Sequence, residues 1–445
     1  MITSTAWRGK RYAVLGLARS GAATVRALVA SGASVLGWDD NEATQRSVWE
    51  QLKADRQELG TEPGFTTKDW VSFPIDLSGF DAVVVSPGVP LNRHPVAEKA
   101  AKYGVPVIGD IELFAQARAD LPPHKVVGIT GTNGKSTTTA LIDHIARTAG
   151  LPSLAGGNIG LPILGRDPLP EGGVYVLELS SYQIDLTFSL DCDVAVLLNI
   201  TPDHLDRYDG FEGYAASKAR LFAMQSKGHA AVIGIGDAPS AEIARQVAVS
   251  GRSEDITRIA PGVCMDQSRW PALQGPHNAQ NALAAIATCE ALGIDKAAID
   301  KGLETFPGLP HRMERVAMKN EVLFVNDSKA TNADSTTPAL SAYPRVHWIL
   351  GGRAKTDSLE ACRPGFGHVV KAYTIGEAGE LFASLLEGEM PVERSGSLAA
   401  AVKSAAANAK AGETVLLSPA CASFDQFKDY EARGQAFRDA VEALG

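Results

Sequence analysis

VVGITGTNGKSTTT, residues 126–139, is the stretch that decides the fold. It opens as an apolar, β-branched run, which is typical of a strand buried on both faces. A turn with two glycines follows, and glycines let the backbone fold tightly so that N–H groups point at an anion. The helix that begins after the turn adds its dipole. Lys135 supplies a charge for outer phosphates and Ser136 a hydroxyl for Mg²⁺, so the segment predicts a phosphate-binding loop.

The loop departs from the common nucleotide-binding pattern in its length. That pattern needs a glycine five residues before Gly134, where this chain has Ile129, and Gly131 lies two residues closer. We therefore predict a short variant of the loop, with a Gly-rich turn and a solvated lysine as the alternative. The residues that we expect to hold the nucleotide are Gly131, Thr132, Asn133, Gly134, Lys135 and Ser136.

Similar apolar runs alternate with Ala-rich stretches on both sides of this loop. The alternation predicts an α/β fold with mostly parallel sheets and right-handed crossovers. Expected strands cover residues 12–15, 82–85, 126–129, 174–177, 194–198, 322–325, 346–350, 369–373 and 414–417, and expected helices cover 22–31, 136–149 and 278–292.

The length of 445 residues suggests three domains, since domains usually have about 100–200 residues. We predict an N-terminal Rossmann-like domain over 1–109 and a central P-loop ATPase-type domain with a mostly parallel sheet over 110–308. Prolines and a glycine at 305–310 suit a linker. A C-terminal Rossmann-like domain is expected over 309–445.

Composition excludes several functions. Lys plus Arg is 42 and Asp plus Glu is 51, giving a net charge of −9, which argues against nucleic acid or anionic membranes as partners but leaves room for a local basic pocket. We find no apolar run long enough for a transmembrane helix and no signal peptide. Five scattered cysteines fit a reducing, cytoplasmic setting better than a disulfide framework.

Two strand ends in the middle segment predict a metal site. Glu178 closes the run at 174–178, at the edge of a parallel sheet where ligands bind, and its carboxylate suits Mg²⁺. The next strand ends in NITPDHLDRY, residues 199–208. There His204 is a candidate ligand of a second metal ion or a residue that orients a ligand, while Asp203 is also a candidate helix cap. The sequence around Lys218 alone predicts that this lysine lies on a helix and is exposed to solvent.

The other two segments also carry polar strand ends. YAVLGLARSG at 12–21 resembles a dinucleotide fingerprint, but Ala18 replaces its second glycine, which disfavours a dehydrogenase and leaves another nucleotide diphosphate open. Asp39 has the spacing of a ribose-binding acid, and a Pro-Gly turn follows at 85–90. Near the C-terminus, NDSKATN at 326–332, GGRAK at 351–355 and SPACASFDQF at 418–427 predict a pocket for a small anion, with simple capping as the alternative.

Together these motifs resemble the Mur ligases, ATP-dependent amide-forming enzymes of peptidoglycan precursor synthesis, over all three segments. The loop alone would also suit folylpolyglutamate synthase. The stretches at 326–332 and 418–427 are similar to the D-glutamate-adding member, and the Asp-Asn-Pro-Arg motif of the diamino-acid-adding member is absent. The resemblance implies that ATP phosphorylates the carboxylate of UDP-N-acetylmuramoyl-L-alanine and that the amine of D-glutamate attacks the acyl phosphate.

The resemblance also implies roles for single residues. ATP contacts fall on Lys135, Ser136, Thr137, Asn278, Asn281, Arg312 and Asp327. Mg²⁺, expected as two ions, would bind Ser136, Glu178, His204 and a carbamylated Lys218. The uridine nucleotide would bind Arg19, Ser20, Asp39, Asp40, Ser86, Gly88 and Asn158. D-Glutamate would bind Lys329, Thr331, Lys355, Ser423 and Tyr430. The chain departs from the family at Asp40 and Asn41, where a Thr and a basic residue are expected, and at Tyr430, where a Phe is expected.

Three rival functions stay open at this point. A folylpolyglutamate synthase should lack a UDP-binding first segment, a non-catalytic nucleotide-binding module should form no amide, and a dehydrogenase should bind nicotinamide. We expect a cytoplasmic monomer that acts on small molecules.

Overall fold

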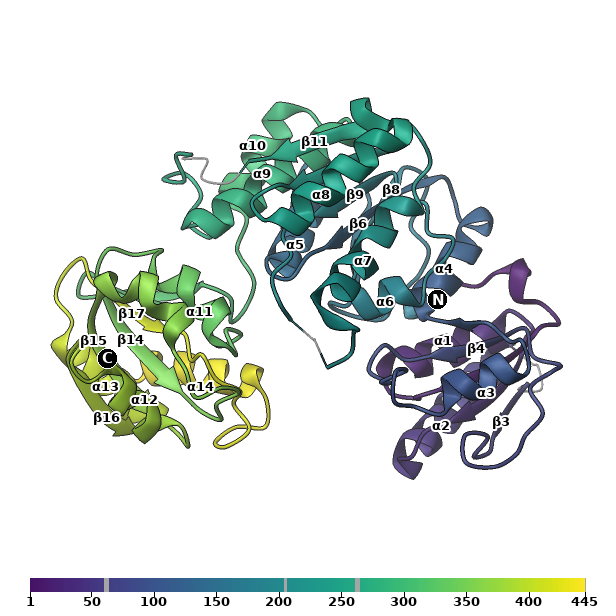
Figure 1. Cartoon of the computed structure of the whole chain (residues 1–445), viewed down its shortest axis with the longest axis horizontal. Coiled ribbons are helices and arrows are strands. Elements are labelled where there is room, and N and C mark those ends of the chain that lie inside the picture. The colour runs from purple at the N-terminus through teal and green to yellow at the C-terminus, as the bar shows by residue number, and fades with distance from the viewer. Residues whose placement is uncertain (60–63, 204–205, 261–264, 445) are drawn as a thin grey trace. The chain divides into compact units, whose positions relative to one another are not determined.

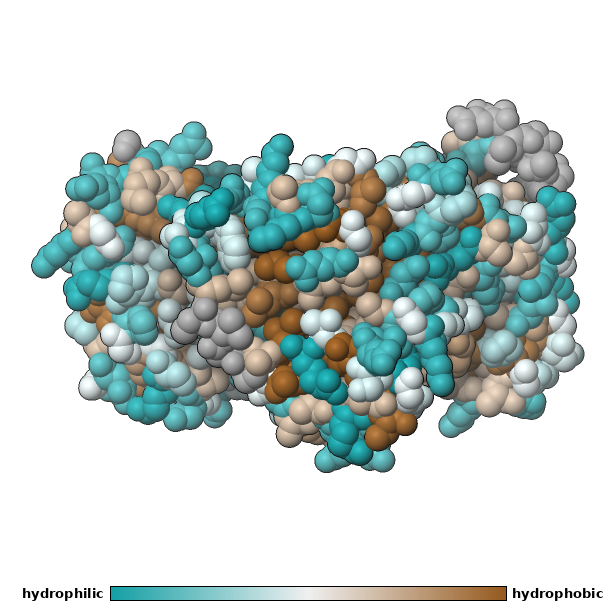
Figure 2. Space-filling view, turned by 90° about the horizontal axis from the view of Figure 1, so that it is seen from above, coloured by the Kyte–Doolittle hydropathy of each residue, from teal (hydrophilic) through white to brown (hydrophobic). Residues whose placement is uncertain are grey.

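The computed structural model describes residues 1–59, 64–203, 206–260 and 265–444, and these residues build three sheets with helices packed against them (Figure 1). They form two compact units, one of Met1–Pro261 with Leu283–Gly302 and the other of Gly262–Ala282 with Leu303–Gly445. Helix α9 (Pro276–Ala291) therefore begins in the second unit and ends in the first, and α10 (Lys296–Thr305) begins in the first unit and ends in the second. None of the helices in these ranges is both long and apolar enough to cross a membrane. On the face drawn in Figure 2, hydrophilic side chains predominate and apolar ones show between them.

The first sheet has five parallel strands in the order β3-β2-β1-β4-β5. The strand order reverses at β1, so the carboxyl ends of β1 and β4 border a crevice of the kind in which α/β proteins bind ligands. Its strands are β1 (Arg11–Leu15), β2 (Ser34–Trp38), β3 (Phe65–Thr67), β4 (Ala82–Val85) and β5 (Val107–Ile108), and its helices are α1 (Arg19–Ala30), α2 (Glu42–Leu59) and α3 (Val96–Lys102).

The second sheet has six parallel strands in the order β11-β10-β9-β6-β8-β7. Strand β6 lies between β9 and β8, so the carboxyl ends of these three strands meet. The strands are β6 (His124–Thr130), β7 (Ser153–Gly157), β8 (Gly173–Glu178), β9 (Val194–Leu197), β10 (Ala230–Gly234) and β11 (Ile256–Ile259), and the helices are α5 (Lys135–Thr148), α6 (Ser181–Asp185), α7 (Gly210–Ala223) and α8 (Ala238–Val247).

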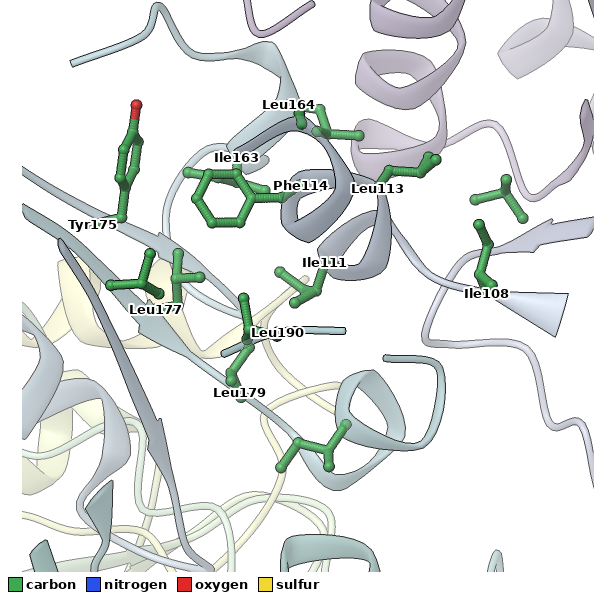
Figure 3. Packing of buried hydrophobic residues seen from close by; sticks show 14 of the residues in the cluster. Ile108, Ile111, Leu113, Phe114, Ile163, Leu164, Tyr175, Leu177, Leu179 and Leu190 are labelled. Carbon is green, nitrogen blue, oxygen red and sulfur yellow. The ribbon is translucent and has the colours of Figure 1, made fainter. Parts of the chain in front are cut away.

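Helix α4 (Asp110–Ala117) connects these two sheets within the first unit. Its side chains Ile111, Leu113 and Phe114 point into one hydrophobic cluster that extends from the first sheet to β8 (Figure 3). The ring of Phe114 meets the ring of Tyr175 edge-on, with centroids 5.1 Å apart. Because each of these apolar side chains contributes about 2 kcal/mol when buried, the shared cluster explains why two sheets behave as one unit.

The third sheet lies in the second unit and has the order β12-β13-β17-β14-β15-β16, with only the edge strand β12 antiparallel to its neighbour. The strands are β12 (Glu314–Lys319), β13 (Val322–Asn326), β14 (Val346–Gly351), β15 (Val369–Ile375), β16 (Val392–Gly396) and β17 (Thr414–Leu417), and the helices are α11 (Ala333–Leu340), α12 (Gly379–Leu386), α13 (Leu398–Asn408) and α14 (Tyr430–Glu442).

The expected fold class is confirmed, because the three sheets are parallel in all but one pairing. Helix α2 is among the elements that the sequence did not predict. The boundaries near residues 109 and 308 stay predictions.

Candidate active site

The phosphate loop connects the end of β6 to the start of α5. Gly131 has φ 148° and Gly134 has φ 88°, conformations that residues with a Cβ rarely adopt. The Nζ atom of Lys135 donates to the carbonyls of Gly131 and Thr132, at 2.8 Å each. The loop thus curls around the ammonium group at the N-terminus of a helix, which is the arrangement that holds phosphate.

Asn199, just after β9, fixes the tip of this loop. Its side chain accepts from the Asn133 N–H at 2.9 Å and donates to the Asn133 carbonyl at 3.1 Å, while its own carbonyl accepts from Thr132 N–H at 2.9 Å. Sequence reasoning gave Asn199 no role. The only signal was its place in the polar cluster after the strand.

Lys218 lies deep inside the site, which corrects the expectation of a solvated lysine. Its side chain is about 1% exposed on α7, and Nζ donates to the Gly131 carbonyl at 3.0 Å. The Lys218 Nζ atom lies 4.5 Å from the ring centre of Tyr214, whose hydroxyl is 3.2 Å from Thr132 Oγ1. Burial and the charge of Lys135 lower the pKa of Lys218 well below its ordinary value, although Asp203 and Asp185 oppose this.

Glu178, at the end of β8, presents one unsatisfied oxygen. Its Oε1 accepts from Asn158 Nδ2 at 2.9 Å, whereas its buried Oε2 has no hydrogen-bond partner among the described residues. Buried polar atoms are rarely left so, and a hard carboxylate oxygen suits Mg²⁺. The described part of the chain holds no group of three or more His, Cys, Asp and Glu able to bind a metal. The predicted ligand His204 lies outside the described residues.

The crevice of the first sheet gathers several residues predicted for the uridine nucleotide. Arg19 and Ser20 begin α1, and Ser86 Oγ donates to the carbonyl of Gly16 at 3.0 Å. Ser20 and Ser86 line a hollow together with Asp110, whose pKa burial raises to about 6. Other predicted members lie nearby in sequence or structure: Gly88 in the turn after Ser86, and Asp39, whose carboxylate accepts from Leu17 N–H at 2.7 Å. Asp40, in contrast, accepts from Trp38 Nε1, and Asn158 contacts Glu178.

In the second unit, Asp327 and most of the residues predicted for D-glutamate follow the carboxyl ends of β13, β14 and β17. Asp327 is buried and accepts from Ser418 Oγ at 2.8 Å, and burial raises the pKa of Asp327 to about 7. Lys329 lies 4.1 Å from the ring centre of Tyr430. The remaining predicted side chains are Ser423, which is buried, Thr331, which is half-buried, Lys355, which is exposed, and Asn278 and Asn281, which are hydrogen-bonded to each other at 3.1 Å. Arg312 comes shortly before β12.

Arg433, on α14, was missed by sequence reasoning. This buried guanidinium donates to Ser328 Oγ at 3.0 Å, to the Ser328 carbonyl at 2.8 Å and to the Cys421 carbonyl at 3.0 Å. Ser328 directly precedes Lys329, and Cys421 lies two residues before Ser423. Arg433 therefore fixes the two loops that carry the residues predicted for D-glutamate.

Comparison with known proteins agrees with this arrangement. Residues 129–258 match the Mur ligase middle domain and residues 311–421 match the Mur ligase, glutamate ligase domain. The chain belongs to the Mur ligases, and it is an ATP-dependent, amide-forming ligase.

The chain also resembles particular members of that family. The UDP-N-acetylmuramoylalanine--D-glutamate ligase of Novosphingobium aromaticivorans is 62% identical over 444 residues, which cover 100% of this chain and 97% of that protein. The ligase of the same name from Zymomonas mobilis is 56% identical over 449 residues, covering all of both chains. Among solved structures, UDP-N-acetylmuramate-alanine ligase MurC of Thermotoga maritima has a TM-score of 0.56 at 16% identity, covering 98% of this chain and 100% of its own, which shows the shared fold.

Proposed function

We propose that this enzyme joins D-glutamate to UDP-N-acetylmuramoyl-L-alanine with ATP, through an acyl phosphate, releasing ADP and phosphate in peptidoglycan precursor synthesis. The observation that carries the proposal is the group formed by the phosphate loop, the buried Lys218 amine and the unsatisfied Glu178 oxygen. The reaction itself is the one named in relatives that are 62% and 56% identical to the chain. These names favour the D-glutamate ligase over a folylpolyglutamate synthase.

The chemistry requires anions to approach each other, because a carboxylate is a poor acylating agent until it is phosphorylated. Lys135 and the loop N–H groups hold the outer phosphates and stabilise the charge that develops on them. Bound Mg²⁺ supplies further charge neutralisation. We propose two ions, held by Glu178 Oε2, the Ser136 hydroxyl, His204 and Lys218.

Lys218 acts in this proposal as a carbamate. Only a neutral amine attacks carbon dioxide, and the lowered pKa favours that form. The neutral nitrogen forms an N–C bond to carbon dioxide as one C=O π bond breaks, and the nitrogen then releases a proton, which leaves an anionic carbamate whose oxygens can bind a metal. This change explains how a lysine stands beside a metal site.

We divide the reactants among the three segments. Residues 1–109 hold the uridine nucleotide, 110–308 hold ATP, and 309–445 hold D-glutamate, with Asn278, Asn281, Arg312 and Asp327 added to the ATP contacts. We also propose that the enzyme acts as a cytoplasmic monomer. The four described cysteines, which are free and buried, fit that setting.

One assay tests the proposal. Phosphate release is measured with ATP, Mg²⁺ and UDP-N-acetylmuramoyl-L-alanine, and each amino acid is supplied in turn. Turnover with D-glutamate alone supports the proposal. Turnover with a folate and L-glutamate, or no turnover with any amino acid, overturns it.

A further inference from the structure

Two neighbouring residues after β9 make four hydrogen bonds to the turn that follows β4. Arg207 donates to the carbonyls of Val89 at 2.8 Å and Gly88 at 3.5 Å. The Asp206 carbonyl accepts from Asn92 Nδ2 and Arg93 Nη2, at 3.0 Å each. These bonds join a loop of the second sheet to the turn of the first sheet that carries Ser86 and Gly88.

The guanidinium of Arg207 is held in place from its other side. It lies 4.2 Å from the ring centre of Tyr182, which stacks on Tyr208 with centroids 5.9 Å apart and an interplanar angle of 11°. The Tyr208 hydroxyl donates to Asp185 at 2.8 Å. A planar guanidinium on an aromatic face keeps a fixed orientation. The Tyr182 ring therefore keeps the N–H groups of Arg207 directed at the turn.

The aromatic contacts continue from Tyr208 to the phosphate loop. Helices α6 and α7 pack together (Figure 1). Tyr208, in the loop before α7, meets Tyr214 of α7 with centroids 5.5 Å apart, and the Tyr214 hydroxyl contacts Thr132 Oγ1 at 3.2 Å. Packed side chains transmit displacements because interiors are dense. An unbroken set of contacts therefore connects the turn at 86–90 to the loop at 131–134.

We propose that Arg207 is a positioning residue that couples occupancy of the nucleotide-substrate turn at 86–90 to the phosphate loop. The inference rests on the proposed function, which places the uridine nucleotide at that turn. The hydrogen bonds that Arg207 donates to described residues go to backbone carbonyls, so Arg207 senses the position of the turn and leaves the substrate to Ser86 and its neighbours. Because such coupling is reciprocal, the nucleotide substrate and ATP should alter each other's affinity by the same factor.

Calorimetry tests the coupling directly. The affinity of a non-hydrolysable ATP analogue with Mg²⁺ is measured with and without UDP-N-acetylmuramoyl-L-alanine, in wild type, Arg207→Ala and Arg207→Lys. We expect the substrate to change analogue affinity at least about threefold in wild type and to leave it unchanged in Arg207→Ala. The analogue alone should bind within about twofold of wild type in both variants, and Arg207→Lys, which keeps the charge, should recover part of the coupling.

Kinetics provide the second readout. Arg207→Ala should raise the KM for the nucleotide substrate about tenfold, and its KM for ATP should no longer depend on the concentration of that substrate. Arg245→Ala is the matched control, because Arg245 is an exposed arginine of α8 that pairs with Glu242, and it should behave as wild type. Tyr182→Leu, which removes the ring beneath the guanidinium, should weaken the coupling as well, so the test does not depend on one variant.

The possible failures are distinguishable. A wild type that does not bind the nucleotide substrate overturns the proposed function. A wild type that binds and turns over but shows no coupling, or an Arg207→Ala variant that keeps the wild-type coupling, overturns this inference alone. An Arg207→Ala variant that loses analogue affinity and thermal stability in parallel also overturns it, because that result indicates a purely structural contact.

Discussion

At the scale of single residues, Lys135 carries the test of the phosphate loop. Lys135→Ala should lower kcat at least about 100-fold, because the charge that faces the outer phosphates is lost. The fold should persist, since the hydrogen bonds of Lys135 to Gly131 and Thr132 lie within the loop itself. Phosphate release and the melting curve measure the two effects. Lys125→Ala, at the opposite end of β6 and exposed, is the matched control. Near-normal turnover of Lys135→Ala would show that the loop is misassigned.

Lys218 allows chemical rescue. Lys218→Ala should lose activity, and formate or acetate should restore part of it, because a small carboxylate replaces the anionic oxygens of the proposed carbamate. Rates with and without additive are compared at constant ionic strength. Lys227→Ala, which removes an exposed lysine, should need no additive. Unchanged activity of Lys218→Ala without additive contradicts the carbamate role.

Asp110 predicts a pH dependence of stability. Burial raises its pKa from 3.8 to about 6, although the Ile111 N–H donates to its carboxylate at 3.0 Å. The unfolded chain releases this proton near pH 4 and the folded chain only near pH 6. The stabilising contribution is therefore complete below pH 4 and is lost as the pH rises through 6.

Asp110→Asn removes this ionisation while keeping an acceptor for Ile111. The free energy of unfolding of Asp110→Asn should exceed that of wild type by an amount that grows between pH 4 and pH 7, to at most about 3 kcal/mol. Urea unfolding at several pH values measures the difference. Glu171→Gln, at an exposed carboxylate, provides the comparison. A difference in the free energy of unfolding between Asp110→Asn and wild type that stays constant with pH would indicate that Asp110 ionises freely in the folded protein.

At the scale of elements, α4 determines the stability of the first unit. Phe114→Ala should lower the free energy of unfolding by about 3–5 kcal/mol. The ring is fully buried, and its removal leaves a cavity against Tyr175. A lower melting temperature with wild-type content of secondary structure is the expected result. The exposed Phe188→Ala change should cost far less. Equal losses in the two variants would contradict the connecting role of α4.

The elements also show how far sequence reasoning reaches. Strands such as β4 and β17 were predicted to the residue, because β-branched runs buried on both faces leave an unbroken apolar signature. Helix α2 was missed because most of its residues are polar and give little periodicity. Asn199 and Arg433 were missed for another reason. Their roles arise where strand ends distant in sequence meet, and no local pattern reports that meeting.

At the scale of the whole molecule, the residues proposed for the two chemical steps are divided between the units. Lys135, Glu178 and Lys218 lie in the first unit, whereas Lys355 and Ser423 lie in the second. The steps should therefore be separable by mutation. If the carboxylate is activated before the amine attacks, a different nucleophile should intercept the activated group in the absence of D-glutamate.

Hydroxylamine is such a nucleophile. With ATP, Mg²⁺ and UDP-N-acetylmuramoyl-L-alanine, it should release phosphate and form a hydroxamate that mass spectrometry detects. Lys355→Ala should reduce turnover with D-glutamate at least about tenfold and leave the hydroxylamine reaction intact, because a small neutral nucleophile needs no cationic partner. Lys135→Ala should lose both reactions. Lys403→Ala, exposed on α13, should keep both. Parallel loss of both reactions in Lys355→Ala would place that lysine in carboxylate activation instead of amino-acid binding.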